Sequence, residues 1–549
     1  MTLKNTRAGI YETLLDLVKC PSVSPGSGEV KLAQLLYDKL ARLPYFRSFP
    51  AHLQLVALEG DPLGRSAVLA LARAQPTTPR TVILTGHFDV VETKESRALA
   101  ELAFDPEQYT AKLSSMKLPD DAKKDLESGN YLFGRGVMDM KSGLALQMAL
   151  LAELSAEPEK MPCNLIFLAV CDEENNSAGM RAAIKRLASL REEEKLDYLA
   201  CINSEGFIPR EPGDRKRYVH LGTIGKIMPM FYCVGREAHV GQYFSGLNAN
   251  LLASAVTLQF EGNPDLADSW HGLPSPPPTT LKQRDLREAY SVTLPARAVV
   301  YFNYLTVTRT PAQVLAQMRE IASAAFEKAV AQVRTAGAKH TEKSGLQVSV
   351  PWQPKVMTYE ELYREVEQAQ SGALSGRLAT FLKALPEELD EREKSIALVG
   401  ELLRLHPDKS PVIVIGFLPP YYPHRSNARQ SPRERGLADA VEELLEEAGA
   451  RFEETFTTSE HFAAISDLSY LGFQGASEEL LPLATNTPGW GQVYDIPLDD
   501  LLALDVPVVN LGPAGKDPHE FTERLELGYS LEVVPQLLKS LVLKLSKLP

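Results

Sequence analysis

The chain has 549 residues, 44% of them hydrophobic and 23% charged, so it is long enough for roughly two to four globular domains. With 58 Lys and Arg against 71 Asp and Glu, its net charge of −13 argues against a nucleic-acid-binding protein, which needs a cationic surface to displace counterions from phosphates. The sequence contains no apolar run of the ~20 residues that span a bilayer, and its 5 cysteines form no C-x-x-C pair. We therefore expect a reduced, cytoplasmic protein that binds neither nucleic acid nor a membrane.

The first 210 residues alternate helix and strand patterns. Apolar residues recur at helical spacing over residues 29–43, 142–154 and 178–190. Continuous apolar runs predict strands at residues 53–58, 67–72, 82–85, 165–171 and 198–203. Strands that are apolar throughout and alternate with helices indicate a mainly parallel sheet covered on both faces, which predicts an α/β domain.

A polar segment with two prolines and a glycine, residues 208–216, interrupts this pattern and predicts a linker. Beyond it we expect strands at 227–234, 298–307 and 346–350 and helices at 248–259 and 311–333. This order suggests a compact α+β module whose sheet is covered on one face and has room for one more strand. The charge-rich helical stretch 360–406 is interpreted as an insertion in that module.

The α/β pattern is expected to resume at residue 411. Strands are predicted at 412–418 and 506–511, and helices at 437–448 and from about residue 534. The simplest organisation is one catalytic domain in two sequence halves, residues 1–212 and 411–549, interrupted by an inserted domain at residues 213–410.

Histidine and carboxylate side chains stand just past predicted strands or before a helix, where ligands bind in open α/β sheets. They are His87 with Asp89, Asp139, Glu173 with Glu174, Glu205, and a late candidate, His519. Each cluster alone has an ordinary structural explanation, such as helix capping by Asp139 or a solvated acidic loop at residues 172–174. Together they supply two histidines and at least three carboxylates, the ligand set of a two-metal hydrolase.

The order of these motifs resembles peptidase family M20, a family of dizinc aminoacylases and peptidases. The motifs are His87-x-Asp89, Gly134-Arg135-Gly136-x-x-Asp139, Asp172-Glu173-Glu174, Glu205 and His519. Residues 17–24 are similar to the opening helix and turn of the family, and residues 238–241 and 246–249 to the start of its inserted domain. Residues 86–91, the step of 139 − 87 = 52 residues from His87 to Asp139, and residues 419–424 are most similar to the branch named for bacterial arginine utilisation.

The resemblance implies a fold as well as a cofactor. The fold is an α/β, zinc-peptidase-like catalytic domain with a mixed, mainly parallel sheet, interrupted by an α+β, ferredoxin-like domain that acts as a lid and dimerisation module. The cofactor is a pair of divalent metal ions, zinc in the first place, with manganese or cobalt as alternatives. The expected assembly is a homodimer formed through the inserted domain.

The resemblance also implies roles for individual residues. His87 and Glu205 would bind one metal, Glu174 and His519 the other, and Asp139 would bridge both. Asp89 would orient His87 through its ring N–H, and Glu173 would be the general base. His239, supplied by the partner subunit, would stabilise the oxyanion, and Asn248 would help to hold the substrate.

The expected reaction is hydrolysis of an amide bond in a small peptide or an N-acyl amino acid. Hydrolysis of another C–N bond, in a carbamoyl or amidino group, would use the same site. A non-catalytic binding protein on this fold would be expected to lack ligands or the base, all of which are present here. Arg309, the nearest candidate for a substrate-carboxylate clamp, is left out of the site, while His461, with Asp467 nearby, could line it.

Overall fold

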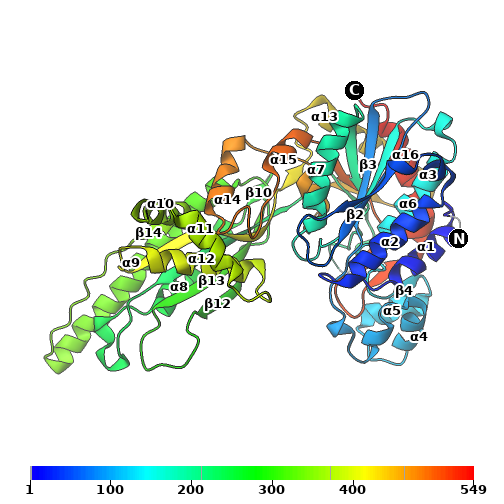
Figure 1. The fold of residues 1–549 in the computed structure, drawn as a ribbon. Coiled ribbons are helices and arrows are strands. Elements are labelled where there is room, and N and C mark those ends of the chain that lie inside the picture. Colours follow the sequence, from blue (N-terminus) through cyan, green and yellow to red (C-terminus); the bar gives the residue numbers. More distant parts are fainter. Residues whose placement is uncertain (1–2, 212, 371, 463) are drawn as a thin grey trace. The chain divides into compact units, whose positions relative to one another are not determined.

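The computed structural model describes residues 3–211, 213–370, 372–462 and 464–549. Contacts between residues divide the chain into two compact units (Figure 1). The first comprises Met1–Ile224, Arg425–Phe473 and Pro497–Pro549, and the second comprises Gly225–His424 and Gln474–Ile496. Within the described residues, no helix is both long enough and apolar enough to span a bilayer.

The first unit is built on a mixed sheet. Its strands lie in the order β1 (Leu53–Ala57), β2 (Ser66–Ala72), β5 (Asn164–Val170), β3 (Arg80–His87), β6 (Asp197–Asn203), β18 (Val508–Asn510), β7 (Arg217–His220) and β17 (Phe456–Ser459). The central pairs β5–β3, β3–β6 and β6–β18 are parallel, and the β1–β2 and β2–β5 pairs are antiparallel. The sheet confirms the predicted α/β class.

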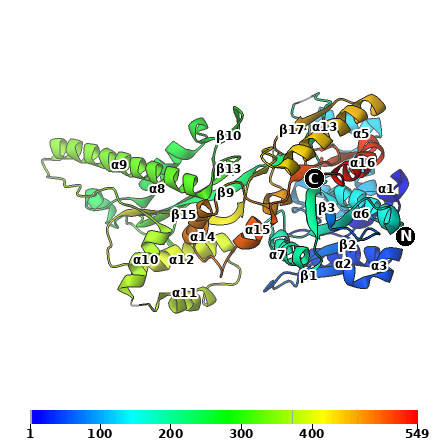
Figure 2. The ribbon, with the colours of Figure 1, turned by 90° about the horizontal axis from the view of Figure 1, so that it is seen from above.

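Helices cover both faces of this sheet, which explains why strands such as β5 are buried along their whole length. One layer contains α1 (Arg7–Val18), α6 (Lys141–Ser155), α13 (Pro432–Phe452) and α16 (Val534–Leu545). The other contains α2 (Ser27–Ala41), α7 (Ala178–Glu193) and α15 (Leu498–Leu504). Figure 2 shows the two layers on opposite sides of the strands.

The long step between His87 and Asp139 has a structural explanation. It holds α4 (Pro106–Leu113), α5 (Asp120–Ser128) and β4 (Tyr131–Phe133). Strand β4 pairs with β20 (Arg524–Glu526), which in turn pairs with β19 (Gly515–Lys516). This small sheet joins the segment before Asp139 to the segment that contains His519.

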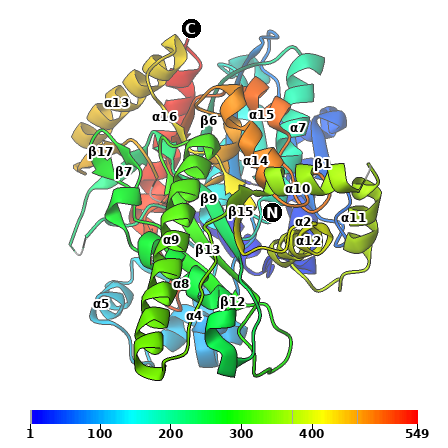
Figure 3. The same cartoon turned by 90° about the vertical axis from the view of Figure 1, so that its left-hand side faces the viewer.

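The second unit has a sheet in the order β12 (Thr279–Asp285), β13 (Arg297–Thr306), β9 (Gly225–Val234), β15 (Val412–Tyr422) and β14 (Val356–Thr358). The first four strands are antiparallel to one another, and β14 is parallel to β15. With α8 (Ala249–Phe260) and α9 (Pro311–Ser344), they follow the ferredoxin-like order of strand, helix, two strands, helix and strand. Figure 3 shows α8 and α9 side by side.

Three predictions about this unit are wrong. The strand predicted at 412–418 exists, but as β15 it lies between β9 and β14 in the second sheet rather than in the catalytic domain. Residues 346–350 form no strand. The sheet is covered on both faces, because α10 (Tyr359–Ala369), α11 (Leu374–Lys383) and α12 (Glu391–Leu405) pack against the face opposite α8 and α9 (Figure 2).

The unit boundaries also differ from the predicted domain boundaries at residues 212 and 410. Strand β7 follows the predicted linker but pairs with β17 and β18 in the first sheet. Strand β15 keeps the chain in the second unit to His424. The segment Gln474–Ile496, which was expected in the catalytic domain, belongs to the second unit as well.

Candidate metal centre

The acidic and histidine side chains of the first unit gather at one edge of its sheet. His87 ends β3, Glu173 and Glu174 follow β5, and Glu205 follows β6. These three strands are adjacent and parallel, so their carboxyl ends meet at the same edge. The alternation of apolar strands and helices in the sequence therefore brings together residues that lie far apart along the chain.

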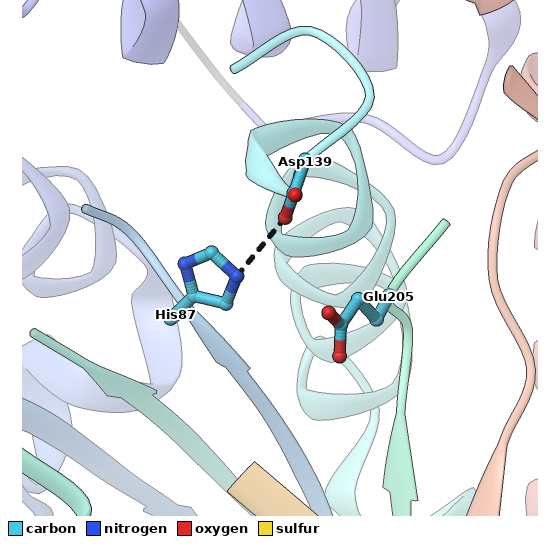
Figure 4. A group of neighbouring side chains, drawn as sticks. All are labelled: His87, Asp139 and Glu205. Carbon is cyan, nitrogen blue, oxygen red and sulfur yellow. Dashed lines mark hydrogen bonds and ion pairs between the residues drawn. The ribbon is translucent and has the colours of Figure 1, made fainter. Parts of the chain in front are cut away.

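Asp139 lies between the two histidines. Its Oδ1 is 3.1 Å from His87 Nε2, and its Oδ2 is 3.2 Å from His519 Nε2. His519 Nε2 is also 3.1 Å from Glu174 Oε1. Figure 4 shows His87 and Glu205 on either side of the Asp139 carboxylate, just before α6 begins. Each oxygen of Asp139 thus faces a different histidine.

Two sets of side chains could each hold a metal ion, His87 with Asp139 and Glu205, and Asp139 with Glu174 and His519. In each set the ligand atoms lie within 4.8 Å of one another. Imidazole nitrogens and carboxylate oxygens suit Zn²⁺, Mn²⁺ and Co²⁺, and a shared carboxylate is expected where two metals are neighbours. The donor set present in the structure therefore fits a pair of divalent cations.

The electrostatics of the cluster also favour cations. Burial raises the pKa of Glu173 and of Glu205 well above the usual range, and neighbouring carboxylates add to the effect. The hydrogen bonds that His519 donates to Asp139 and Glu174 raise its pKa to about 10, and the carboxylates around His87 raise the pKa of His87 despite its burial. In the absence of metal, the side chains of the site therefore bind protons, which offset its negative charge.

The contact between Asp89 and His87 differs from the expected one. The ring Nδ1 of His87 lies 3.1 Å from the backbone carbonyl oxygen of Asp89 and 3.7 Å from its carboxylate. The carboxylate instead accepts the backbone N–H groups of Glu173 and Glu174, both at 3.1 Å. Residue 89 therefore orients His87 through its main chain and fixes the loop after β5 through its side chain.

Two asparagines that the sequence analysis missed hold Glu205 in place. Asn203 Nδ2 donates to Glu205 Oε2 at 3.0 Å and to Ser466 Oγ at 2.9 Å. Asn510 in β18 accepts the Glu205 N–H through Oδ1 and donates to its carbonyl through Nδ2, at 3.0 and 2.9 Å. The only feature of the local sequence that points to these hydrogen bonds is the position of Asn203, two residues before Glu205.

A buried ion pair, also missed, supports the backbone before Asp139. Glu523 accepts from Arg135 Nη1 at 2.7 Å and from the Gly136 N–H at 2.8 Å. Arg135 Nη2 donates to the His519 carbonyl at 2.7 Å. This pair ties the segment that contains Asp139 to the segment that contains His519.

Asp467 is a further carboxylate at the site. It begins the short 3₁₀ helix Asp467–Leu471, which contacts β3, β6 and β18, and it is 1% exposed. Among the described residues neither of its oxygens has a hydrogen-bond partner, and burial raises its pKa to about 7. It interacts electrostatically with His87 and with Glu173. His461, in contrast, accepts through its carbonyl from His220 Nδ1.

The remaining predicted residues belong to the second unit. His239 is exposed and accepts the Gly241 N–H through Nδ1 at 3.1 Å, which assigns its proton to Nε2. Asn248 caps α8 by accepting the Asn250 N–H at 2.9 Å. Arg309 donates to the Leu266 carbonyl at 2.5 Å, so its guanidinium serves the fold of this unit.

Comparison with known proteins identifies relatives along most of the chain. Residues 83–481 match the profile of "Peptidase family M20/M25/M40". The protein YqjN of Bacillus subtilis is 35% identical over 549 residues, covering 99% of this chain and 97% of its own length. Protein RocB of the same organism is 31% identical over 524 residues, covering 95% and 92%. A succinyl-diaminopimelate desuccinylase of Bordetella avium is 25% identical over 322 residues, covering 57% and 72%.

Solved structures share the fold. A tripeptidase from Staphylococcus aureus has a TM-score of 0.51 at 13% identity, with 100% of both chains covered. An M20 family metallo-carboxypeptidase from Sulfolobus solfataricus has a TM-score of 0.51 at 12% identity, with 98% of this chain and 99% of that chain covered.

Proposed function

Because the chain belongs to peptidase family M20 and is a metal-dependent hydrolase, we propose that it cleaves the amide bond of a small peptide or an N-acyl amino acid. The observation that carries the proposal is the Asp139 carboxylate, which presents one oxygen to each histidine beside Glu174 and Glu205. The relatives named as a desuccinylase and as peptidases also act on amide bonds. Zinc is the proposed metal, with manganese or cobalt as alternatives.

The proposed mechanism assigns proton transfer to Glu173. A pair of divalent metals held by these residues would lower the pKa of bound water and so supply a nucleophile for the carbonyl carbon at neutral pH. Glu173 accepts a proton on its carboxylate and passes it to the nitrogen of the leaving amine. Its Oε2 lies 3.9 Å from His87 Nε2, at the edge of the metal-ligand cluster, and its side chain is only 8% exposed. A buried carboxylate with a raised pKa is suited to this exchange.

In this proposal, His239 and Asn248 act on the substrate. The Nε2–H of His239 points away from its own capping interaction and is available to donate to the oxyanion that forms at the carbonyl. Asn248 keeps its Nδ2 hydrogens for the substrate, because only its Oδ1 serves the helix cap. Neither residue has a buried structural role that would compete with these functions.

We propose a homodimer formed through the second unit. Strand β12 lies at the end of its sheet, so one edge is open to pairing with another strand. Helix α8 packs beside it, and the exposed leucines Leu258 and Leu281, at 78% and 50%, add apolar surface to the same region.

The cysteines are all free and four are buried, which fits the proposed cytoplasmic location.

The test of the mechanism compares Glu173→Gln with Glu192→Gln, a control on the exposed side of α7. We expect Glu173→Gln to lower kcat by about 10²- to 10⁴-fold, because the amide cannot accept a proton. Its metal content, measured by plasma mass spectrometry, should equal that of the wild type and of the control. Loss of metal in Glu173→Gln would make Glu173 a ligand, and near-normal turnover would remove it from the mechanism.

The test of the substrate class uses a panel of dipeptides, N-acyl amino acids and ureido acids, assayed with added Zn²⁺, Mn²⁺ or Co²⁺. The proposal predicts turnover of at least one of the first two classes and its loss on treatment with a chelator. Turnover of the ureido acids alone would contradict it.

A further inference from the structure

The second unit contains a cavity that lies outside the metal centre. Its volume is about 460 Å³, and its walls come from α10, α11, α12 and residues 484–492. This volume lies within the range of small-molecule binding sites, roughly 300–1,000 Å³. The helices belong to the stretch between α9 and β15 that exceeds the ferredoxin-like order, so the cavity exists because of this addition.

The walls are mainly apolar. They include the aromatic rings of Tyr359, Tyr363 and Trp490 and the side chains of Leu378, Leu382 and Leu398. Tyr359, Leu378 and Leu398 are buried and belong to the apolar cluster on this face of the sheet. Such a lining is suited to an apolar group, with the flat rings available to contact it face-on.

The wall formed by residues 484–492 is held in place. Asn486 accepts the backbone N–H of Glu360 at 3.1 Å, and the Pro488 carbonyl accepts from Ser395 Oγ at 2.8 Å. The Tyr359 hydroxyl accepts the backbone N–H of Gly489. These bonds join the segment to α10 and α12, so a ligand would not have to order the wall when it binds.

Two charged side chains line the cavity. Glu360 and Arg364 lie one turn apart on α10, form an ion pair with each other, and are 30% and 66% exposed at their side chains. Thr487 also lines the cavity, but it is 2% exposed and its Oγ1 is buried.

We propose that this cavity binds a free α-amino acid with an apolar side chain. The carboxylate and the ammonium group of such a ligand lie close together, as Arg364 and Glu360 do, and each finds an opposite charge. The apolar side chain fills the space between the rings and leucines. A purely anionic or purely cationic ligand would leave one of the two charges on α10 unmatched. The site lies wholly in the second unit and does not depend on the proposed reaction.

The terminal residue of a peptide is the main alternative source of the same chemistry. It carries only one of the two charges, because the other is consumed in the peptide bond. Binding of L-phenylalanine is therefore compared with binding of N-acetyl-L-phenylalanine, L-phenylalaninamide and glycine, by isothermal titration calorimetry on the full-length, metal-loaded protein. We expect L-phenylalanine to bind at least tenfold more tightly than each of the other three.

A pair of variants locates the binding. Arg364→Gln removes the positive charge at the cavity, whereas Arg319→Gln removes an arginine of α9 that pairs with Glu361 outside the cavity. We expect Arg364→Gln to weaken binding roughly tenfold and Arg319→Gln to leave it unchanged.

Several results would overturn the proposal. Equal binding to wild type and Arg364→Gln would place the ligand elsewhere, including at the metal centre. Equal binding of the acetylated or amidated compound would make a peptide terminus the ligand. No measurable heat with any apolar amino acid at millimolar concentration would leave the cavity without this function.

Discussion

At the scale of single residues, Asp467 is a carboxylate whose ionised form is costly in the metal-free protein. Its pKa is raised from 3.8 to about 7 by burial, so the folded state holds the proton more tightly than the unfolded state does. Its contribution to stability is complete below about pH 4 and is lost as the pH rises to about 7. We expect Asp467→Asn, which is neutral throughout, to escape this loss.

The measurement is thermal unfolding of wild type and Asp467→Asn in a chelator at pH 5 and pH 8. The free energy of unfolding of Asp467→Asn relative to wild type should be about 2–3 kcal/mol more favourable at pH 8 than at pH 5. Each kcal/mol corresponds to roughly 2–4 °C in Tm. Asp439→Asn, which removes an exposed carboxylate from α13, is the control. A difference in Tm that does not change with pH would contradict the argument.

The histidines predict how metal binding depends on pH. With a pKa of about 10, the His519 ring carries protons on both nitrogens at pH 7.5 without metal, and the raised pKa of His87 favours the same doubly protonated form. A metal needs the lone pair on each ring, so loading the site should release about two protons or more. Calorimetric titration of the metal-free protein with Zn²⁺ in buffers of different ionisation enthalpy measures this number. A binding enthalpy that is the same in every buffer would contradict the prediction.

The candidate ligand residues could be picked out in the sequence because each follows a recognisable strand or precedes a helix. Their supports could not. Asn510 is 305 residues from Glu205, and Glu523 is 388 residues from Arg135, and much of what they bind is backbone. A backbone N–H is present at nearly every position, so no pattern in the sequence marks which one will need a side-chain partner.

At the scale of elements, β15 shows the same limit. Its eleven residues are all buried, as expected for a central strand of either sheet. Apolar character predicts that such a run is a strand, but its partner strands depend on contacts that are distant in sequence. The helices α10 to α12 were predicted as an insertion, whereas their packing on the second sheet depends on apolar faces that only the fold brings together.

The loop after β5 depends on a buried arginine. Arg65 contacts Asp172 at 2.6 Å, Glu29 at 3.2 Å and Asp61 at 2.8 Å. Asp172 immediately precedes Glu173 and has a positive φ of 67°, so the arginine braces a turn that carries two site residues. Arg65→Met would leave buried carboxylates facing one another without a cation.

We expect Arg65→Met to lower the free energy of unfolding by about 3–5 kcal/mol in urea titrations, and to lower metal content because Glu174 loses its fixed position. Arg7→Met is the matched control, since the pair between Arg7 and Glu532 is exposed at 57% and 50% and should cost under about 1 kcal/mol. Equal losses in the two variants would show that the buried network does not brace the loop.

At the scale of the whole molecule, the site requires both ends of the chain. Strand β18 lies between β6 and β7, and the pair between Arg135 and Glu523 joins the segments around Asp139 and His519. The sequence predicted this assembly of two halves, because the late histidine follows a strand of the same kind as the early ones. It could not predict that Gln474–Ile496 returns to the second unit, since that segment has no distinctive composition.

The proposed dimer leads to a prediction that depends on residues from both subunits. Glu173 lies in the first unit and His239 in the second, and the proposal takes His239 from the partner subunit. In a mixture of Glu173→Gln and His239→Ala, subunit exchange should form heterodimers. One of the two sites in each heterodimer then combines an intact base from one chain with an intact His239 from the other. Loss of one oxyanion donor costs about 10²- to 10³-fold in kcat, so each parent should be nearly inactive. The mixture should approach a quarter of wild-type activity when exchange is complete.

Exchange is verified independently with two affinity tags, and the dimer by light scattering, before activity is compared. The control is a mixture of wild type with the double variant that carries both Glu173→Gln and His239→Ala. In each of its heterodimers, one site lacks the base and the other lacks the oxyanion donor. If His239 served its own subunit instead, every site in the first mixture would lack one of the two groups, and no activity would return. The physical basis is that a histidine with its Nε2 proton free on an exposed turn can reach another chain, whereas the ligands at the strand ends are fixed within their own sheet. A verified heterodimer without recovered turnover would therefore rule out donation between subunits.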